Sequence, residues 1–462
     1  MPERSDILVL GGGLSGLSCA TALAEAGRKV TVLEKKPHLG GRAHSFHDPD
    51  TGLTWDNGAH LFAGPCRNMT RFLRRIGRET QLRFPEFLRV DVFDGTGADS
   101  LRIPAALGAR FGLLWAVWRL KGLEAADKWG ILRLRRSLAV ADPRDLDRLT
   151  ARQWLDSLGQ SRRIQDRLFD PLAMALLNEP PALASAAVVS QAFRELFMGG
   201  ADAMRLGWSA APLSELYAEP ARAFIEARGG HVLLSTEVTR LMEDNGRVTA
   251  AADEWGQKFH AQAVVSTLPP WDLVGLELPA GLDGPWKGLE STPAVTVHLR
   301  FDRPVLDFPI AGMLGTTARW AFSRDAAGEG VGGQGRGRGL RPSVPPALGE
   351  GVGGQGLSLA VSAGRDVLKA APAAFIEAAL RDLAKCLPES RKARMTGWKV
   401  VKEDHARLSH ARGTEERRPR PGVVLPGMSF AGDWTRTGFT ASMESAVASG
   451  QRAAEELMQS HA

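Results

Sequence analysis

Three glycines near the start of the chain have the spacing of a phosphate-binding turn. Gly11, Gly13 and Gly16 lie in the run GGGLSG, which follows a short apolar run and opens a helical pattern. The first glycine permits a tight turn, the second lets backbone approach a pyrophosphate, and the third allows a helix and a strand to pack closely. The N-terminus of the helix offers free N–H groups to the phosphates. This arrangement predicts that the chain binds a dinucleotide.

Glu34 closes the next apolar run, and its carboxylate can accept hydrogen bonds from an adenosine ribose. An acid at this position also argues against a cofactor with a 2′-phosphate. The glycine spacing recurs at residues 330–335 and 351–356, but neither copy follows a strand or opens a helix. We therefore predict one dinucleotide site and no tightly held nicotinamide cofactor.

The elements around these residues form a β-α-β unit. The apolar runs Asp6–Leu10 and Lys29–Leu33 predict strands, and Leu17–Ala26 predicts a helix rich in small residues. Residues 61–220 are mainly helical in pattern. After them come short strands, and Asn245-Gly246 gives a type I′ hairpin signal between two of these.

A low-complexity segment interrupts the second half of the chain. Asp325–Gly356 contains GEGVGGQG twice, around a middle rich in arginine and proline. Such glycine content costs too much chain entropy to pack a core. We expect a flexible surface insertion created by local duplication.

Two segments far apart in the chain resemble the cofactor fingerprints of the flavin amine oxidase and phytoene desaturase superfamily. They are LGGRA at Leu39–Ala43 and FAGDWTRTGFTASMESA at Phe430–Ala446. The resemblance implies FAD, with the first segment close to the flavin and diphosphate and the second against the ribityl chain. It also implies that the N-terminus of the last helix points at the flavin ring, where the positive end of the helix dipole would stabilise negative charge on reduced flavin. The expected cofactor-binding residues are Gly11, Gly13, Gly16, Glu34, Gly40, Gly41, Arg42, Val238, Gly432, Asp433 and Met443.

The resemblance implies an α/β fold in two interleaved parts. An FAD-binding Rossmann-like domain of the glutathione-reductase type is expected at residues 1–60, 221–275 and 421–462. A mixed α+β substrate domain is expected at residues 61–220 and 276–420, with the low-complexity insertion at 325–356.

Two features separate the chain from the amine oxidases of this superfamily. Those enzymes commonly carry a lysine that holds water against flavin N5, and the corresponding run Val295–Phe301 has no lysine. They also flank the flavin with an aromatic side chain where this chain has Ser442. The segments Asp56–Gly64, Pro212–Gly230 and Ala431–Gly450 instead resemble the bacterial hydroxysqualene dehydroxylases.

That resemblance implies FAD-dependent reductive dehydroxylation of hydroxysqualene to squalene, in hopanoid and isoprenoid biosynthesis. Ionisation of the allylic alcohol gives a delocalised cation, which hydride from reduced flavin quenches. The protein must protonate the departing oxygen, position the substrate and exclude water. His60 is the candidate acid because histidine titrates near working pH, and Asp56 is the candidate that orients it. Purely structural roles for both residues remain open alternatives.

Two other functions are alternatives. A phytoene-type carotenoid desaturase would take hydride from a polyene, so the flavin would run in the opposite direction. A non-enzymatic prenyl-lipid carrier, like the Rab GDP-dissociation inhibitors, would share the fold without flavin. The intact set of cofactor residues argues against the carrier.

A basic and apolar segment, Leu101–Leu138, predicts contact with a membrane surface. Its apolar runs are too short to span a bilayer. Trp115, Trp118 and Trp129 could sit at headgroup depth while arginines meet anionic lipid, and helices that simply cap the substrate domain are the alternative. The net charge of +6 also allows nucleic acid, but no zinc pattern or RNA-binding signature accompanies it. We expect no nucleic-acid partner.

The three cysteines, Cys19, Cys66 and Cys386, lack metal-ligand or CxxC spacing, so we expect neither a metal site nor a disulfide framework. No secretory signal precedes the first strand. The sequence thus predicts a cytoplasmic protein, peripheral on the inner face of the bacterial membrane. Its expected partners are a hydrophobic isoprenoid substrate and the upstream enzymes of the squalene pathway.

Overall fold

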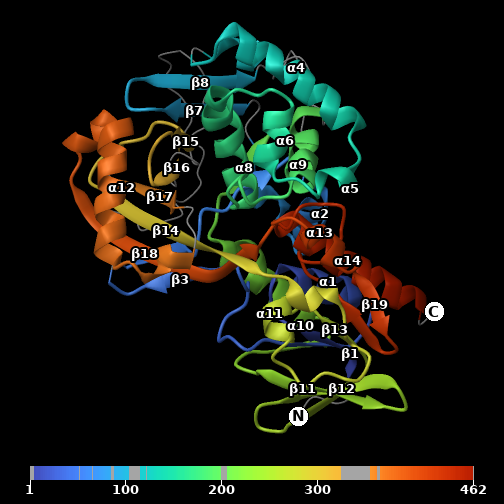
Figure 1. The fold of residues 1–462 in the computed structure, drawn as a ribbon. Helices are drawn as coiled ribbons and strands as arrows, with labels where there is room; N and C mark the ends of the chain where they lie inside the picture. The colour runs from blue at the N-terminus through green and yellow to red at the C-terminus, as the bar shows by residue number, and fades with distance from the viewer. Residues whose placement is uncertain are drawn as a thin grey trace.

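The computed structural model describes residues 5–50, 52–64, 66–84, 88–103, 115–120, 122–198, 205–323, 354–361 and 365–460. These residues form two large sheets and two small ones with helices around them, in the mixed α/β arrangement that the sequence predicts (Figure 1). Residues 325–353 of the expected insertion lie outside the described residues. The last residues of that expected insertion, Gln355 and Gly356, belong to a strand.

The first sheet joins strands from three distant parts of the chain. Its central strands are parallel and buried on both faces, which explains their continuous apolar runs. The strands in order are β10 (His231–Leu233), β2 (Val30–Leu33), β1 (Ser5–Leu10), β13 (Lys258–Ser266), β12 (Arg247–Asp253) and β11 (Val238–Asp244), with β20 (Met428–Phe430) beside β13 and β19 (Gly422–Leu425) beside β20.

The β-α-β unit and the hairpin of this sheet match the sequence predictions. The helix α1 (Leu14–Glu25) connects β1 to β2, three residues earlier than predicted at its start. Asn245 and Gly246 both have positive φ, at 51° and 74°, as a type I′ turn requires.

The second sheet collects strands from the middle of the chain. In order they are β18 (Met395–Leu408), β14 (Ser291–Phe301), β17 (Gln355–Val361), β16 (Ala318–Ser323), β15 (Ile310–Met313), β7 (Leu88–Phe93) and β8 (Ala98–Ile103). The hairpin β7–β8 interrupts the region predicted to be mainly helical. It adds to the sheet through parallel pairing of β7 with β15, a long-range contact that local patterning does not reveal.

Short strands and the helices complete the fold. The remaining strands are β3 (Ser45–Asp48), β4 (Leu53–Asp56), β5 (Phe62–Ala63), β6 (Leu82–Arg83) and β9 (Leu206–Ser209). The other helices are α2 (Arg67–Arg75), α4 (Ala125–Val140), α5 (Pro143–Leu146), α6 (Ala151–Ser157), α7 (Arg162–Ile164), α8 (Asp170–Leu177), α9 (Ala186–Met198), α10 (Glu219–Glu226), α11 (Pro270–Leu273), α12 (Pro372–Cys386), α13 (Thr414–Arg417) and α14 (Met443–Ser460).

Helices cover both sides of the second sheet. One apolar core joins α4, α6, α8 and α9 to Trp320 of β16, and another joins α12 to Val297 of β14 and Leu359 of β17. Figure 1 shows α12 on the outer side of the second sheet. We call the second sheet with its helices one lobe and the first sheet with its helices the other; β14 and β18 run from the former toward the latter. The two long strands therefore connect the lobes at the place where the site lies.

Candidate active site

A cavity of about 1650 Å³ extends between the two lobes. Its polar end is lined by the glycine-rich turn after β1, by residues 40–43 and by the segment before α14. Its apolar end lies among the helices and strands of the second lobe. A site for one small ligand usually measures about 300–1,000 Å³, so this cavity has room for two ligands end to end.

The glycine-rich turn forms the wall of the polar end. Gly11 has φ of +101°, a conformation that side chains rarely adopt. A Cβ on Gly16 would lie 2.0 Å from the Gly11 carbonyl oxygen, so Gly16 lets α1 pack on the turn and does not itself line the cavity. A Cβ on Gly41 would lie 3.1 Å from the Cα of Gly13. Gly13 and Gly41 thus let the two backbone segments pack closely at the cavity wall.

Glu34 directly follows β2, and its carboxylate is held by backbone N–H groups. Its Oε2 accepts from Gly12 N at 2.6 Å, and its Oε1 accepts from Lys36 N at 2.9 Å. The side chain is buried and lines the cavity. Val238, the first residue of β11, lines the same end.

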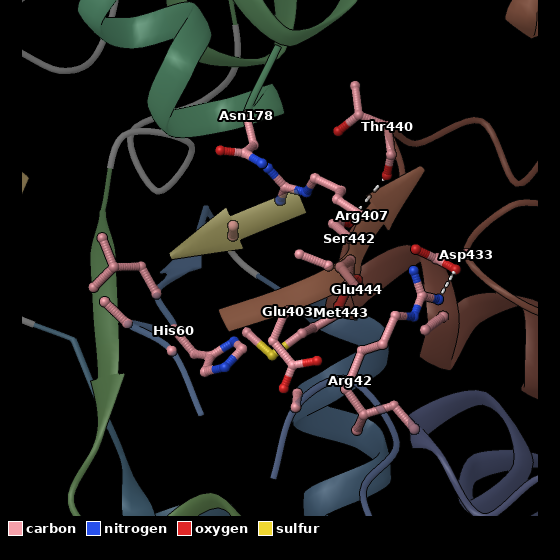
Figure 2. A pocket seen from close by; sticks show the side chains of 18 of the residues that line it. Arg42, His60, Asn178, Glu403, Arg407, Asp433, Thr440, Ser442, Met443 and Glu444 are labelled. Atoms are coloured by element: carbon pink, nitrogen blue, oxygen red, sulfur yellow. Dashed lines mark hydrogen bonds and ion pairs between the residues drawn. The ribbon is translucent and has the colours of Figure 1, made fainter. Parts of the chain in front are cut away.

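The segment Leu39–Ala43 brings the two ends of the chain together. Gly40 and Gly41 have φ of +108° and +61°, and the Tyr217 hydroxyl donates to the Gly40 carbonyl at 3.2 Å. Arg42 forms an ion pair with Asp433 (Figure 2). Both residues line the cavity, and Asp433 is buried.

The C-terminal segment is fixed directly on the glycine-rich turn. The Gly432 N–H donates to Ser449 Oγ at 2.8 Å, and that hydroxyl lies 3.0 Å from Ser15 Oγ on α1. A Cβ on Gly450 would lie 2.2 Å from the Ser15 carbonyl oxygen, so α1 and α14 are in close contact. Met443 begins α14 and lines the cavity.

Glu444, in the first turn of α14, caps a second helix. Its two carboxylate oxygens accept from the backbone N–H groups of Asn68 and Met69, both at 2.9 Å, in the first turn of α2. A carboxylate is favoured at a helix N-terminus. The Glu444 charge therefore serves α2, and α14 keeps its N-terminus toward the cavity.

His60 lines the cavity, and we call the region around it the junction (Figure 2). Its Nε2 is 3.1 Å from Asn57 Oδ1. Asp56 is not among the cavity-lining residues, and its Oδ1 accepts from Ser45 Oγ at 2.6 Å and from Leu213 N at 3.1 Å. Orientation of His60 by Asp56 therefore remains a prediction, while the contact present here is with Asn57.

Sequence reasoning missed Asn57, Glu403 and Arg407, all of which line the cavity. Asn57 is the direct neighbour of Asp56, and the two side chains have different partners. Glu403 and Arg407 lie on β18, whose mixed polar and apolar pattern gave no functional signal. Burial lowers the pKa of the Arg407 guanidinium, against the opposing effect of the Asp433 charge.

Cys66 of the cavity wall and His44, which lies behind that wall, are both held in their neutral forms at neutral pH. Burial, with the nearby charges of His38 and Lys36, lowers the pKa of His44 beside the Gly40–Gly41 turn to about 4. Burial raises the pKa of the Cys66 thiol to about 12. A thiol in this state is a poor nucleophile, so Cys66 acts as a packing residue.

Comparison with known proteins agrees with this geometry. A family model described as flavin containing amine oxidoreductase matches residues 14–458. The chain belongs to this family. It is accordingly an FAD-dependent oxidoreductase.

The chain is similar to hydroxysqualene dehydroxylases and to phytoene desaturases. Hydroxysqualene dehydroxylase of Rhodopseudomonas palustris is 30% identical, with 97% of each chain covered, and that of Sinorhizobium fredii is 28% identical, with 98% of each chain covered. The 15-cis-phytoene desaturase of Synechococcus elongatus is 25% identical over 98% of this chain and 95% of that protein. Cyclohexylamine oxidase from Brevibacterium oxydans has the same fold, with a TM-score of 0.73 at 17% identity over 99% of this chain and 100% of that chain.

The residues of the polar end fit the FAD of this flavin-containing family. The bare backbone at Gly13 and Gly41 leaves room for a diphosphate, and Glu34 offers a buried carboxylate for ribose hydroxyls. Asp433 and the N-terminus of α14 line the same continuous cavity. Except for Gly16, every residue predicted from sequence to bind FAD lines this cavity.

The run Val295–Phe301, which the resemblance aligns with a lysine-bearing strand of amine oxidases, lies in β14. Val295 and Thr296 of β14 line the cavity, and the strand contains no lysine. Ser442 caps α14 by accepting from Ser445 N at 3.2 Å. These positions thus lack the lysine and the aromatic side chain that the sequence comparison associated with amine oxidation.

The far end of the cavity is predominantly apolar. It is lined by side chains of α8 and the helical turn before it, of α9 and of the second sheet, including Leu168, Leu172, Met174, Ala175, Leu196, Ile310, Trp320, Phe322, Ala360 and Val361. Such a lining favours a long apolar molecule.

Proposed function

We propose that this chain removes the hydroxyl group of hydroxysqualene reductively, giving squalene and water. The observation that carries the proposal is the continuity of one cavity from the FAD cradle into a long apolar end. Similarity to hydroxysqualene dehydroxylases over nearly the whole chain supports it. Bound FAD in its reduced form supplies the hydride for this reaction.

The residues of the chain have three tasks in this reaction. The apolar wall binds the hydrocarbon arms and displaces water that would otherwise capture an allylic cation. The polar junction near His60 holds the hydroxyl group and supplies a proton to it. The N-terminus of α14 stabilises negative charge at the polar end of the site.

The test is an anaerobic incubation of chemically reduced holoenzyme with hydroxysqualene, followed by chromatography and mass spectrometry of the extracted lipids. We expect squalene to form in proportion to oxidised flavin. Stable hydroxysqualene and unchanged flavin would refute the proposal.

A phytoene-type desaturase is the second candidate, because phytoene desaturases also match along nearly the whole chain. It would take hydride from the lipid, so oxidised holoenzyme incubated with phytoene would become reduced. The same chromatographic assay, with the flavin oxidised at the start, separates the two functions.

We also propose that the enzyme takes its substrate from the surface of an anionic membrane. Trp118 and Trp129 are 52% and 57% exposed and meet edge to face at 5.6 Å. Arg119 and Lys128 lie over neighbouring indole rings. Tryptophan and basic side chains together favour an anionic lipid interface.

This tryptophan surface adjoins the apolar end of the cavity. Leu120 and Leu123, which follow Trp118 in the chain, line the cavity. Lipid could thus pass between bilayer and cavity over a short path. Among the helices of the described residues, none is both long and apolar enough to cross a bilayer.

A further inference from the structure

The side-chain amide of Asn57 contacts two candidate proton donors of the cavity, Glu403 and His60. Its Nδ2 donates to the Arg42 carbonyl and to Glu403 Oε1, both at 3.0 Å. Its Oδ1 accepts from the backbone N–H of His44 at 3.1 Å and faces His60 Nε2 at 3.1 Å. All four hydrogen-bonding positions of the amide are therefore used.

Two backbone partners fix which amide atom is oxygen and which is nitrogen. The His44 N–H can only donate, and the Arg42 carbonyl can only accept. Oδ1 of Asn57 therefore faces His60, so His60 Nε2 must carry a hydrogen and donate it. That nitrogen is engaged with Asn57 and is not available to a substrate oxygen.

Glu403 presents its other oxygen to the cavity. Oε1 accepts from Asn57, whereas Oε2 has no hydrogen-bond partner among the described residues. The side chain lines the cavity, and Figure 2 shows its carboxylate between His60 and Arg42 in that view. Glu403 thus lines the cavity with one oxygen anchored and the other without a partner among the described residues.

An irregularity of β18 brings Glu403 to this position. On β14, Thr292 and Ala294 are two residues apart. Their partners on β18, Arg407 and Glu403, are four residues apart. β18 therefore contains extra residues between its two contacts with β14. Such bulges re-aim side chains and are frequent beside active sites.

We propose that Glu403 donates the proton to the departing hydroxyl group and that Asn57 positions it. This inference rests on the proposed function. The proton of Glu403 Oε2 passes to the hydroxyl oxygen, and the C–O bond breaks with its electron pair going to oxygen, so water leaves. Reduced FAD, when bound, would supply the hydride that the allylic carbon needs. The sum is an alcohol, a proton and a hydride giving a hydrocarbon and water.

The Glu403 carboxylate has a second role after it has donated its proton. Asn57 Nδ2–H stabilises the negative charge left on Glu403, and that charge in turn stabilises the allylic cation nearby. Glu403 then takes up a proton from solvent, which restores the acid for the next turnover.

The experiment compares Glu403→Gln and His60→Gln, with exposed Glu254→Gln as the control. Reduced holoenzyme is mixed anaerobically with hydroxysqualene, and both flavin oxidation and squalene are followed. We expect Glu403→Gln to slow the single-turnover rate by about 100-fold or more, the usual contribution of general acid catalysis. FAD content and squalene binding, measured by tryptophan fluorescence, should match wild type.

The outcomes separate this inference from the proposed function. If Glu403→Gln forms squalene at the wild-type rate, the role of Glu403 is overturned but the proposed function stands. The same holds if the single-turnover rate falls further in His60→Gln than in Glu403→Gln. Absence of squalene with wild-type enzyme overturns the proposed function and the inference with it. If Glu403→Gln loses FAD, Glu403→Asp takes its place and should give a slow rate with an unchanged KM. An unchanged kcat in that variant contradicts the inference.

Asn57→Ala tests the positioning role. The proton donor remains in this variant but loses its anchor, so kcat should fall while KM for hydroxysqualene stays near the wild-type value. A raised KM with unchanged kcat would assign Asn57 to substrate binding and overturn its positioning role.

Discussion

The guanidinium of Arg42 donates to the carboxylate of Asp433, a residue 391 positions later in the chain. Asp433 is buried and Arg42 is partly exposed to the cavity. The pair links the segment after β2 to the segment before α14. Both residues were predicted from sequence to contact FAD, and their pairing means that each also holds the other in place.

Loss of either partner should weaken FAD binding. Arg42→Ala leaves a buried carboxylate unpaired, and Asp433→Ala removes the ion pair together with a side chain predicted to contact the ribityl chain. We expect each to weaken FAD affinity about tenfold or more, which is about 1.4 kcal/mol. Because the residues share one contact, the double variant should lose less than the sum. Titration of the apoprotein with FAD measures this, with exposed Arg74→Ala as the control.

The buried imidazole of His44 should make stability depend on pH. Its pKa is lowered from 6.5 to about 4, so below about pH 6.5 the unfolded chain takes up a proton that the folded chain does not. The free energy of unfolding should therefore fall between about pH 6.5 and 4, by up to about 3 kcal/mol, and then level off.

His44→Gln should remove this part of the pH dependence. Urea unfolding across the same pH range gives the measurement. His410, whose pKa burial also lowers well below its ordinary value, contributes a slope of the same sign in both proteins. The difference between variant and wild type is therefore the relevant quantity, and identical slopes would count against the role of His44.

A large side chain in the apolar end should block lipid without affecting FAD. Ala175 lines the cavity on α8, and Ala175→Trp would fill space that the hydrocarbon needs. We expect KM for hydroxysqualene to rise about tenfold or more, while FAD content is retained. Val423→Trp on exposed β19 is the control. Normal kinetics in Ala175→Trp would place the hydrocarbon elsewhere.

The tryptophan surface should bind anionic vesicles. Replacing Trp118 and Trp129 together by alanine should weaken co-sedimentation with phosphatidylglycerol vesicles about tenfold or more, and salt should weaken binding of the wild type. Trp255→Ala is a matched control, because Trp255 is 83% exposed on the other lobe. Equal losses in both variants would indicate nonspecific adsorption.

The FAD cradle could be predicted from sequence because its features are local. The spacing of Gly11, Gly13 and Gly16 between a strand and a helix is dictated by backbone geometry, which the chain shows directly. The same holds for the Asn245-Gly246 turn. Elements decided by local chain geometry were therefore correctly assigned.

The acid-base residues could not be chosen in the same way. The sequence pointed to Asp56, and the structure places its neighbour Asn57 in the cavity and Asp56 against Ser45. Glu403 reaches the cavity through an irregular pairing of β18 with β14, a long-range relation that no local pattern contains. The β7–β8 hairpin was missed for the same reason.

The discontinuous first sheet has a consequence for biosynthesis. β1 and α1 are made early, but β20 and α14, which complete their surroundings, are translated after all the other elements described. Until those late elements arrive, the nascent chain exposes apolar surface that it will later bury, a condition that invites chaperone binding. Newly made enzyme should therefore become yellow only after translation has finished.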